Sequence, residues 1–294
     1  MSAIRHLLAA LLAPLALAGC DVAADGTLVM LDQRYRPRML IPAEQGVAMA
    51  DGLRWRSGAL LIADEGGSAF RAWSGPGRLR TLSDRSSGID SPEDFVVDAE
   101  GNIFFTDDDA GGLWQIDPAG RTRLVAGKDK GLVSTEAIAL HPSGALLVGD
   151  GKRHRIFRVE RDGRVFDFLG PERGIRKPES MVFDPAGNLL IADNEENVLY
   201  LLTPDGTLRK VVEKEEGFSP ETLWHDGRTL LITDSVHGKL SRYSLAGGLQ
   251  PIAVFGGKLR TVTGVTTDPA GNIYLGINLD PGERIGAILR LDVK

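Results

Sequence analysis

The sequence repeats itself with a period of 42 or 43 residues over most of its length. The segment SPEDFVVDAEGNIFFTDD, residues 91–108, and the segment KPESMVFDPAGNLLIADN, residues 177–194, share one layout. In both, an acidic residue precedes an apolar run, a Gly-Asn turn, a second apolar run and an Asp. Self-similarity at a fixed period indicates a repeat architecture in which each unit packs against its neighbours. The repeat therefore constrains the fold more than composition does.

Two positions of the repeat keep phase along the chain. The first is acidic in five copies and Thr in the sixth, with spacings of 42, 43, 43, 42 and 42 residues: Asp51, Glu93, Glu136, Glu179, Glu221 and Thr263. The second closes the next apolar run: Asp64, Asp107, Asp150, Asp193, Asp234 and Ile277. We call these the first and second registers. Together they indicate six copies of one unit.

Each copy contains four short apolar runs separated by residues typical of turns. In the fourth copy the runs are 179–183, 189–192, 198–202 and 207–212. The first turn contains Pro185, which presets φ for a type I turn, and Gly187, which supplies the left-handed position before the next strand. Four strands in a unit of this length are typical of a propeller blade. We therefore predict an all-β fold, a six-bladed β-propeller with four antiparallel strands in each blade.

The sixth copy has only three such runs, because the chain ends just after the run 287–291. The segment 37–42, PRMLIP, precedes Asp51 by the spacing that fourth strands keep before the next acidic residue. We predict that this N-terminal strand closes the last blade, which would otherwise expose an unpaired edge. The propeller would then span residues 37–294, with residues 20–36 as a tether.

The first nineteen residues have the pattern of an export signal. Arg5 and His6 precede the apolar run 7–18, which is too short to span a membrane as a permanent helix. The run ends in Leu-Ala-Gly-Cys, which resembles the bacterial lipobox, and Cys20 is the only cysteine of the chain. A single Cys excludes a disulfide framework.

We therefore expect residues 1–19 to be a lipoprotein signal peptide, and Cys20 to carry lipid after its removal. The alternative is an ordinary secretory signal, cleaved near Asp25. A lipid on Cys20 would anchor the protein in the bacterial cell envelope, at the periplasmic or other extracytoplasmic face. Asp21 follows the Cys, which favours the inner membrane. The lipid would be the only contact with a membrane. A formal net charge of -6 argues against a nucleic-acid partner, because phosphate binding requires a concentrated basic face.

The first register is expected to surround the mouth of the central channel, since the innermost strands of a propeller line it. Converging carboxylates raise one another's pKa, so the ring needs compensation. Three arrangements are open: a divalent cation, basic side chains that reach in, or carboxylates spread apart in water. The connections that lead to the ring carry the candidate basic residues: Arg85, Lys128, Lys130, Arg173, Arg176, Lys177, Lys214, Lys258 and Arg260. For the second register we favour a structural role, with each Asp accepting hydrogen bonds from turn amides.

Three phrases, PEDFVVDAEGNIFFTDD, HPSGALLVGDGKRHRIFRV and PESMVFDPAGNLLIAD, resemble the NHL repeat and the related senescence marker protein/gluconolactonase family. The resemblance covers residues 46–294 and implies a six-bladed propeller. It also implies a channel metal, most simply calcium, held from the first register by Asp51, Glu93, Glu179 and Glu221. Glu136 would be a fifth ligand or the base that activates water. The family mixes Glu, Asn and Asp at these positions, whereas this chain has no Asn there.

Two functions from different classes follow. The first is a divalent-metal-dependent hydrolase of a lactone or similar ester, with His237, in the loop after Asp234, as another candidate general base. The second is a non-catalytic NHL-type scaffold that binds a protein, peptide or glycan across the channel face. The partner is accordingly a small molecule or a protein or glycan on that face.

Overall fold

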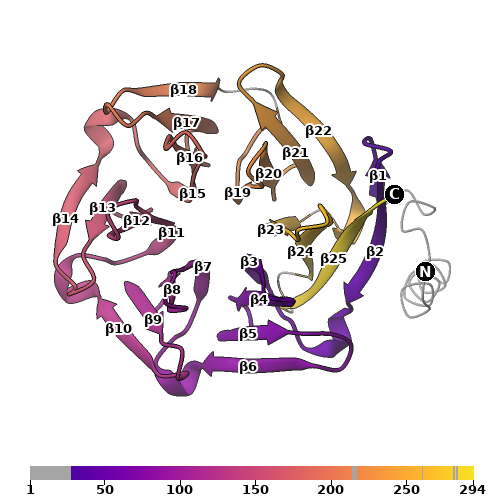
Figure 1. Cartoon of the computed structure of the whole chain (residues 1–294), viewed down its shortest axis with the longest axis horizontal. Coiled ribbons are helices and arrows are strands. Elements are labelled where there is room, and N and C mark those ends of the chain that lie inside the picture. Colours follow the sequence, from indigo (N-terminus) through magenta and orange to yellow (C-terminus); the bar gives the residue numbers. More distant parts are fainter. Residues whose placement is uncertain (1–27, 214–216, 260, 281, 283) are drawn as a thin grey trace, which may run out of the picture.

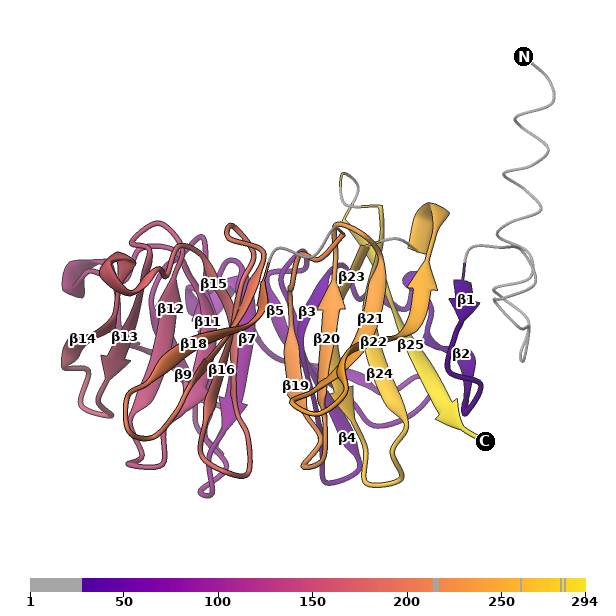
Figure 2. The ribbon, with the colours of Figure 1, turned by 90° about the horizontal axis from the view of Figure 1, so that it is seen from above.

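The computed structural model describes residues 28–294 except 214–216, 260, 281 and 283, so the predicted signal peptide and Cys20 lie outside the described residues. Six antiparallel sheets form a ring, and the strand that begins each sequence repeat lies nearest the centre (Figure 1). Seen from the side, the strands run between the two faces of the ring (Figure 2). The predicted all-β, six-bladed propeller is confirmed. None of the helices in the described part of the chain has the length and apolar character needed to cross a membrane.

The first four blades follow one another along the chain. Blade one contains β3 (Ala50–Arg56), β4 (Ala59–Asp64), β5 (Ala69–Trp73) and β6 (Leu79–Asp84), and blade two contains β7 (Pro92–Val97), β8 (Ile103–Asp107), β9 (Leu113–Ile116) and β10 (Thr122–Ala126). Blade three contains β11 (Thr135–Leu140), β12 (Leu146–Asp150), β13 (Arg155–Val159) and β14 (Val165–Leu169). Blade four contains β15 (Pro178–Phe183), β16 (Leu189–Asp193), β17 (Val198–Leu202) and β18 (Leu208–Glu213). In the fourth blade the observed and predicted strand limits agree to within one residue.

The last two blades also use strands from the N-terminal part of the chain. Blade five contains β19 (Leu223–His225), β20 (Leu230–Asp234), β21 (Lys239–Ser244) and β22 (Gly248–Phe255), and β1 (Leu28–Met30) adds a fifth strand to it. Blade six contains β23 (Thr261–Thr267), β24 (Ile273–Asp280) and β25 (Ile285–Val293), with β2 (Tyr35–Ile41) outermost.

Short 3-10 helices precede the innermost strands of five blades: η3 (Ala43–Gln45), η4 (Arg85–Ser87), η5 (Lys128–Lys130), η6 (Pro171–Arg173) and η7 (Gly257–Leu259). The helices η4 and η5 each end at a Gly with φ near +92°, Gly88 at 93° and Gly131 at 92°. Only Gly adopts this left-handed conformation without steric cost, so these glycines set the direction in which the chain enters the next blade.

The turns between first and second strands form as their sequence predicts. In the fourth blade the Asp184 carboxylate accepts hydrogen bonds from the backbone N–H of Ala186 at 2.9 Å and of Asn188 at 2.8 Å. Gly187 has a φ of 82°. The carboxylate thus satisfies the turn amides, and the turn holds the two strands in register.

The hydrophobic core lies between neighbouring blades. Each of six apolar clusters joins the facing sides of two adjacent sheets. One cluster contains Ile156 of β13 and Ile191 of β16, and another contains Leu231 of β20 and Leu289 of β25. Burying a side chain of this size contributes about 1.5–3 kcal/mol, so no blade is stable without its neighbours.

The ring closes as predicted, because β2 pairs antiparallel with β25 as the outer strand of the last blade. The register brings Pro37 opposite Leu291 and Met39 opposite Leu289. The predicted tether, in contrast, is too long at its C-terminal end. Residues 28–30 form β1 on β22, and Tyr35 already belongs to β2. Leu28 is fully buried in the apolar cluster between blades five and six, which is why this segment packs instead of extending into solvent.

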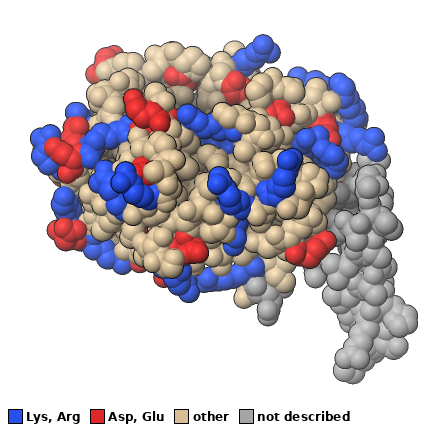
Figure 3. All heavy atoms as spheres, turned by 60° about the horizontal axis from the view of Figure 1, so that its bottom comes forward, with Lys and Arg blue, Asp and Glu red and all other residues tan. Residues whose placement is uncertain are grey.

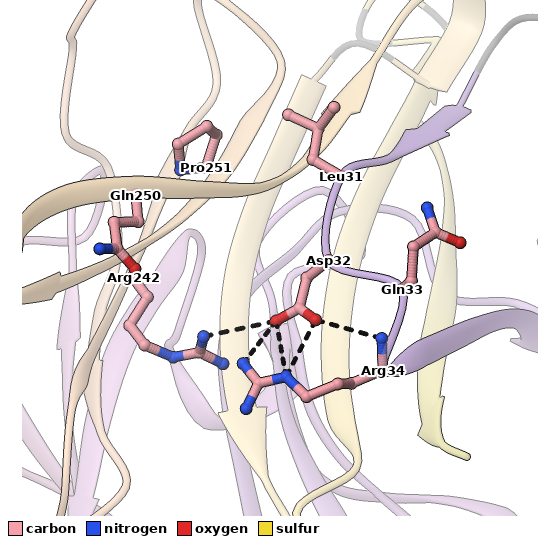
Figure 4. Close-up of a pocket in the computed structure, with 7 residues that line it drawn as sticks. All are labelled: Leu31, Asp32, Gln33, Arg34, Arg242, Gln250 and Pro251. Carbon is pink, nitrogen blue, oxygen red and sulfur yellow. Dashed lines mark hydrogen bonds and ion pairs between the residues drawn. The ribbon is translucent and has the colours of Figure 1, made fainter.

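The turn between β1 and β2 is also attached to blade five. Asp32 accepts hydrogen bonds from its neighbour Arg34 at 2.6 Å and forms an ion pair with Arg242 of β21 at 3.4 Å (Figure 4). The hydrogen bonds from Arg34 lower the pKa of Asp32 to about 2, against the opposing effect of burial. Residues 28–41 therefore connect the last two blades of the ring from outside.

Candidate functional site

Five carboxylates converge at one end of the central channel, as predicted for the first register. Asp51, Glu93, Glu136, Glu179 and Glu221, together with Asp94 and Thr222, line one cavity of about 20 Å³. A cavity of that volume accommodates about one water molecule or ion. The geometric prediction is therefore correct, whereas the assignment of these residues as metal ligands stays a prediction.

β-Bulges direct these side chains into the channel. The pairing of β3 with β4 shifts register between Ala50 and Gly52, and that of β15 with β16 shifts between Pro178 and Ser180. The skipped residues are Asp51 and Glu179. An extra residue in one strand turns a side chain away from its normal alternation. The bulge thus explains why an acidic residue at the start of a mainly apolar strand points into the cavity.

The second register has the structural role that we favoured. Its Asp residues pair with the starts of the innermost strands, as Asp107 does with Pro92 and Asp193 with Pro178. The Asp107 carboxylate accepts hydrogen bonds from the backbone N–H groups of Asp90 at 2.8 Å and Ser91 at 3.0 Å. Equivalent bonds are made by Asp64, Asp150, Asp193 and Asp234. Each Asp thus fixes the segment that leads into a first-register carboxylate.

Lys177 neutralises one side of the acidic ring. Its Nζ lies 2.9 Å from Glu179 and 3.5 Å from Glu136. Burial disfavours the charged ammonium, but the two carboxylates outweigh burial and raise the pKa of Lys177 above its usual value. For Glu136, burial is the largest effect and raises the pKa to about 7 although Lys177 opposes it. Burial and the charges of Glu221 and Glu136 raise the pKa of Glu179 as well.

The other side of the ring is a cluster of three carboxylates, Asp51, Glu65 and Glu93. One oxygen from each lies within 4.8 Å of the others. Burial, followed by the charge of Glu65, raises the pKa of Asp51 well above its usual value. Burial and the charges of Asp51 and Glu65 do the same for Glu93. Among the described residues, no Lys, Arg or His pairs with this cluster. Within the described residues, the ring therefore has one side that a basic side chain compensates and one side without such a partner.

Glu65 was missed by the sequence reasoning. It directly follows the second-register Asp64, and the corresponding position of other blades also reaches the ring. Ser235 donates a hydrogen bond to Glu221 at 2.7 Å. Burial raises the pKa of Glu136 most, and the charge of Asp108 raises it further, whereas Lys177 lowers it. A polar residue next to a buried, strand-ending Asp is the sequence signal that would have identified this third position.

The other basic side chains that the structure describes on the mouth-side connections contact groups outside the acidic ring. Lys128 donates to the backbone oxygen of Asp109 at 2.8 Å, Lys130 to that of Gly163 at 2.9 Å, and Arg85 pairs with Asp90. The side chains of Lys214, Lys258 and Arg260 lie outside what the structure describes. On the face seen in Figure 3, Lys and Arg side chains are interspersed with Asp and Glu.

His237 does not line the acidic cavity. Its Nδ1 lies 3.0 Å from the Asp234 carboxylate, and its backbone N–H donates to the same group at 2.8 Å. This contact holds the imidazole on its own loop. The catalytic role assigned to His237 from the sequence stays a prediction.

Solved structures of low sequence identity share this architecture. A gluconolactonase from Xanthomonas campestris matches with a TM-score of 0.72 at 18% identity, over 94% of this chain and 96% of its own. A calcium-binding protein, regucalcin, from Agrobacterium tumefaciens matches with a TM-score of 0.68 at 17% identity, over 87% and 93%. Virginiamycin B lyase from Staphylococcus aureus has a TM-score of 0.62 at 14% identity, over 86% and 88%. No family model matches the chain, and no curated protein matches it by sequence.

The fold and the site define a six-bladed propeller with a partly compensated acidic ring at one end of its channel. The chain is similar in structure to gluconolactonase and regucalcin. At these identities the similarity establishes the fold, and one propeller architecture supports many functions.

Proposed function

We propose that this protein is a divalent-cation-dependent hydrolase of a lactone or similar small ester, with its site at the acidic end of the channel. One observation carries the proposal: three carboxylates, Asp51, Glu65 and Glu93, lie together without a basic partner among the described residues. The structural similarity to a gluconolactonase and to a calcium-binding regucalcin supports the same reading.

The donor set fits calcium. Calcium takes six to eight oxygen ligands, largely carboxylates and water, and the cluster offers three carboxylates beside a water-sized cavity. A cation there would offset the like-charge repulsion that raises the pKa of Asp51 and Glu93. When bound, it would polarise a carbonyl oxygen and lower the pKa of a water molecule. Glu179 and Glu221, which we predicted as ligands, lie on the Lys177 side of the ring.

Glu136 is the residue of this chain best placed to move a proton. Its pKa of about 7 lies near neutral pH, where a general base is most effective. Its Oε2 is buried and makes no hydrogen bond within the described structure. Lys177 contacts Glu136 at 3.5 Å. Burial raises the pKa of Glu93, a member of the carboxylate cluster, and the charge of Glu136 raises it further. The cavity of about 20 Å³ is too small for an organic substrate, which would therefore approach from the mouth of the channel.

The second candidate is a non-catalytic NHL-type scaffold that binds a protein, peptide or glycan on the channel face. The ion pairs of Lys177 with Glu136 and Glu179 favour it, because they satisfy part of the ring without a metal. In either case we propose an extracytoplasmic protein of the bacterial envelope, anchored through lipid on Cys20.

The test combines cation binding with hydrolysis. Calcium at a hundredfold excess over its dissociation constant stabilises a fold by about 2.7 kcal/mol, which thermal unfolding detects readily. We expect this stabilisation in the parent and in the control Glu100→Gln, an exposed residue, and its loss in Glu65→Gln. Hydrolysis of glucono-δ-lactone and a panel of other lactones and esters should require the same cation.

Two results would contradict the proposal. If calcium, magnesium, manganese and zinc all leave the melting temperature unchanged, the cluster holds no cation. If calcium stabilises the parent but no lactone or ester is hydrolysed, the site binds metal without this catalysis, and the scaffold is the better function.

A further inference from the structure

The end of the channel opposite the acidic ring is an apolar cup. It has a volume of about 300 Å³ and is formed by residues at or next to the C-terminal ends of five innermost strands. Its walls are Trp55, Val97, Leu140, Phe183 and Trp224, with two arginines. In five of the six blades the innermost strand thus has an acidic residue of the first register near its start and an apolar side chain near its end. A volume near 300 Å³ and a mainly apolar lining are properties of small-molecule sites.

A buried ion pair separates the cup from the acidic cavity. Arg54 lines the cup, Asp94 lines the cavity, and the two side chains are 2.8 Å apart. The Arg54 guanidinium also lies 5.1 Å from the Trp224 ring and 5.4 Å from the Phe95 ring. These contacts hold the Arg54 side chain between the cup and the acidic cavity, so that the ion pair of Arg54 with Asp94 separates the two. The cup is therefore a second site, independent of the function proposed above.

The aromatic walls of the cup are held in place from behind. The Trp224 indole donates a hydrogen bond to the Thr267 hydroxyl at 2.9 Å. Trp55 stacks on Tyr274, with ring centroids 5.0 Å apart. Fixed aromatic walls lose little conformational entropy when a ligand binds, so they favour affinity.

The charge of the cup is positive. Among the residues that the structure describes, Arg54 and Arg56 are the charged residues that line it, and no described Asp or Glu does. The exposed Arg56 donates to the backbone oxygen of Asp98 at 3.3 Å, which positions the guanidinium without neutralising it. Two carboxylates close to these arginines are paired: Asp94 with Arg54 at 2.8 Å, and Asp98 with Arg161 at 2.9 Å. An apolar cup with an uncompensated cation is complementary to an amphipathic anion.

We propose that the cup binds a small organic anion that has an aliphatic or aromatic body and one carboxylate. The body would fill the space between Trp55, Leu140 and Trp224. The carboxylate would lie at Arg56. Neutral and cationic molecules with the same body would bind less well, because they lack this ion pair.

Tryptophan fluorescence tests the proposal with defined probes. Trp55 and Trp224 line the cup, whereas Trp73 and Trp114 are buried within other parts of the blades. The full-length protein is titrated with decanoate, 1-decanol and decyltrimethylammonium below their micelle concentrations. We expect a saturable change with decanoate, weaker binding of decanol, and the weakest binding of the cation.

Two variants with matched controls locate the binding. Arg56→Ala should weaken decanoate binding about fivefold and leave decanol binding unchanged, since an exposed ion pair contributes up to about 1 kcal/mol. Arg80→Ala, an exposed Arg on β6 of the same blade, should have no effect. Leu140→Asp should abolish binding of decanoate, whereas Leu245→Asp, at a position that is 62% exposed, should retain it.

Each result of these titrations either supports the proposal or contradicts it. The proposal is wrong if decanoate gives no saturable signal, or if it binds Leu140→Asp as tightly as the parent. Equal binding of decanoate and decyltrimethylammonium would overturn the preference for anions. If Leu140→Asp is unfolded by circular dichroism, the Arg56→Ala comparison of decanoate with decanol decides alone, because Arg56 is exposed and packs little.

Discussion

The acidic ring should make the metal-free protein less stable as pH rises, and Glu136 allows the effect to be calculated. Its pKa is about 7 in the folded protein, against an ordinary value of 4.5. Below pH 4.5 the group is protonated in both folded and unfolded states and contributes nothing. Above pH 7 it is ionised in both, and the folded state then bears the cost of a buried charge. Stability therefore falls between these two values.

The difference between the two pKa values corresponds to about 3 kcal/mol at 1.36 kcal/mol for each pH unit. Glu136 is only 8% exposed, so solvent screening reduces this figure little. Glu136→Gln removes the buried charge. At pH 8 the variant should therefore be more stable than the parent by up to about 3 kcal/mol, which is roughly 6–12 °C in melting temperature for a chain of this size. At pH 5 the gain should be much smaller.

The assay is thermal unfolding by circular dichroism at pH 5 and pH 8, with EDTA present so that no cation occupies the ring. The exposed Glu100→Gln provides the matched control and should leave both melting temperatures unchanged. If Glu136→Gln instead destabilises the protein at pH 8, then Lys177 keeps Glu136 ionised and favourably paired, and the argument from burial is wrong.

Three further predictions concern closure, the second register and the anchor. Deleting residues 28–41 removes β1 and β2 and should cause aggregation and a large loss in melting temperature. Deleting residues 21–27 should cause neither. If the two deletion variants behave alike, the ring closes without these strands. Asp107→Asn should lower the free energy of unfolding by about 2–3 kcal/mol in urea denaturation, because the buried carboxylate accepts hydrogen bonds from the backbone N–H groups of Asp90, Ser91 and Ala110. The control Asp162→Asn, at an exposed position, should leave the free energy of unfolding unchanged. An unchanged urea midpoint for Asp107→Asn would refute the structural role of the second register. Cys20→Ser should abolish labelling by radioactive palmitate and release the protein from the membrane fraction; persistent labelling would exclude Cys20 as the lipid site.

The sequence alone determined the number of blades, the strands and the closing strand. These features are local or periodic: a turn such as 184–188 is encoded by its own Asp, Pro and Gly, and a repeat of 42 or 43 residues places the same element in each blade. The convergence of Asp51, Glu93, Glu136, Glu179 and Glu221 followed as well, because equivalent residues of a ring must face its centre.

Only the tertiary structure decided how the ring is compensated. The pattern offers several basic residues on the mouth-side connections, and nothing in their spacing distinguishes Lys177, which reaches Glu179, from Lys128, which reaches a backbone oxygen. Glu65 and Asp51 of the first blade meet Glu93 of the second, because the ring places the mouth-side ends of these two adjacent blades side by side. The apolar cup arises in the same way, since Trp55 and Trp224 lie far apart in the sequence and meet only when the ring is closed. Such contacts depend on side-chain reach between blades, which a one-dimensional period does not encode.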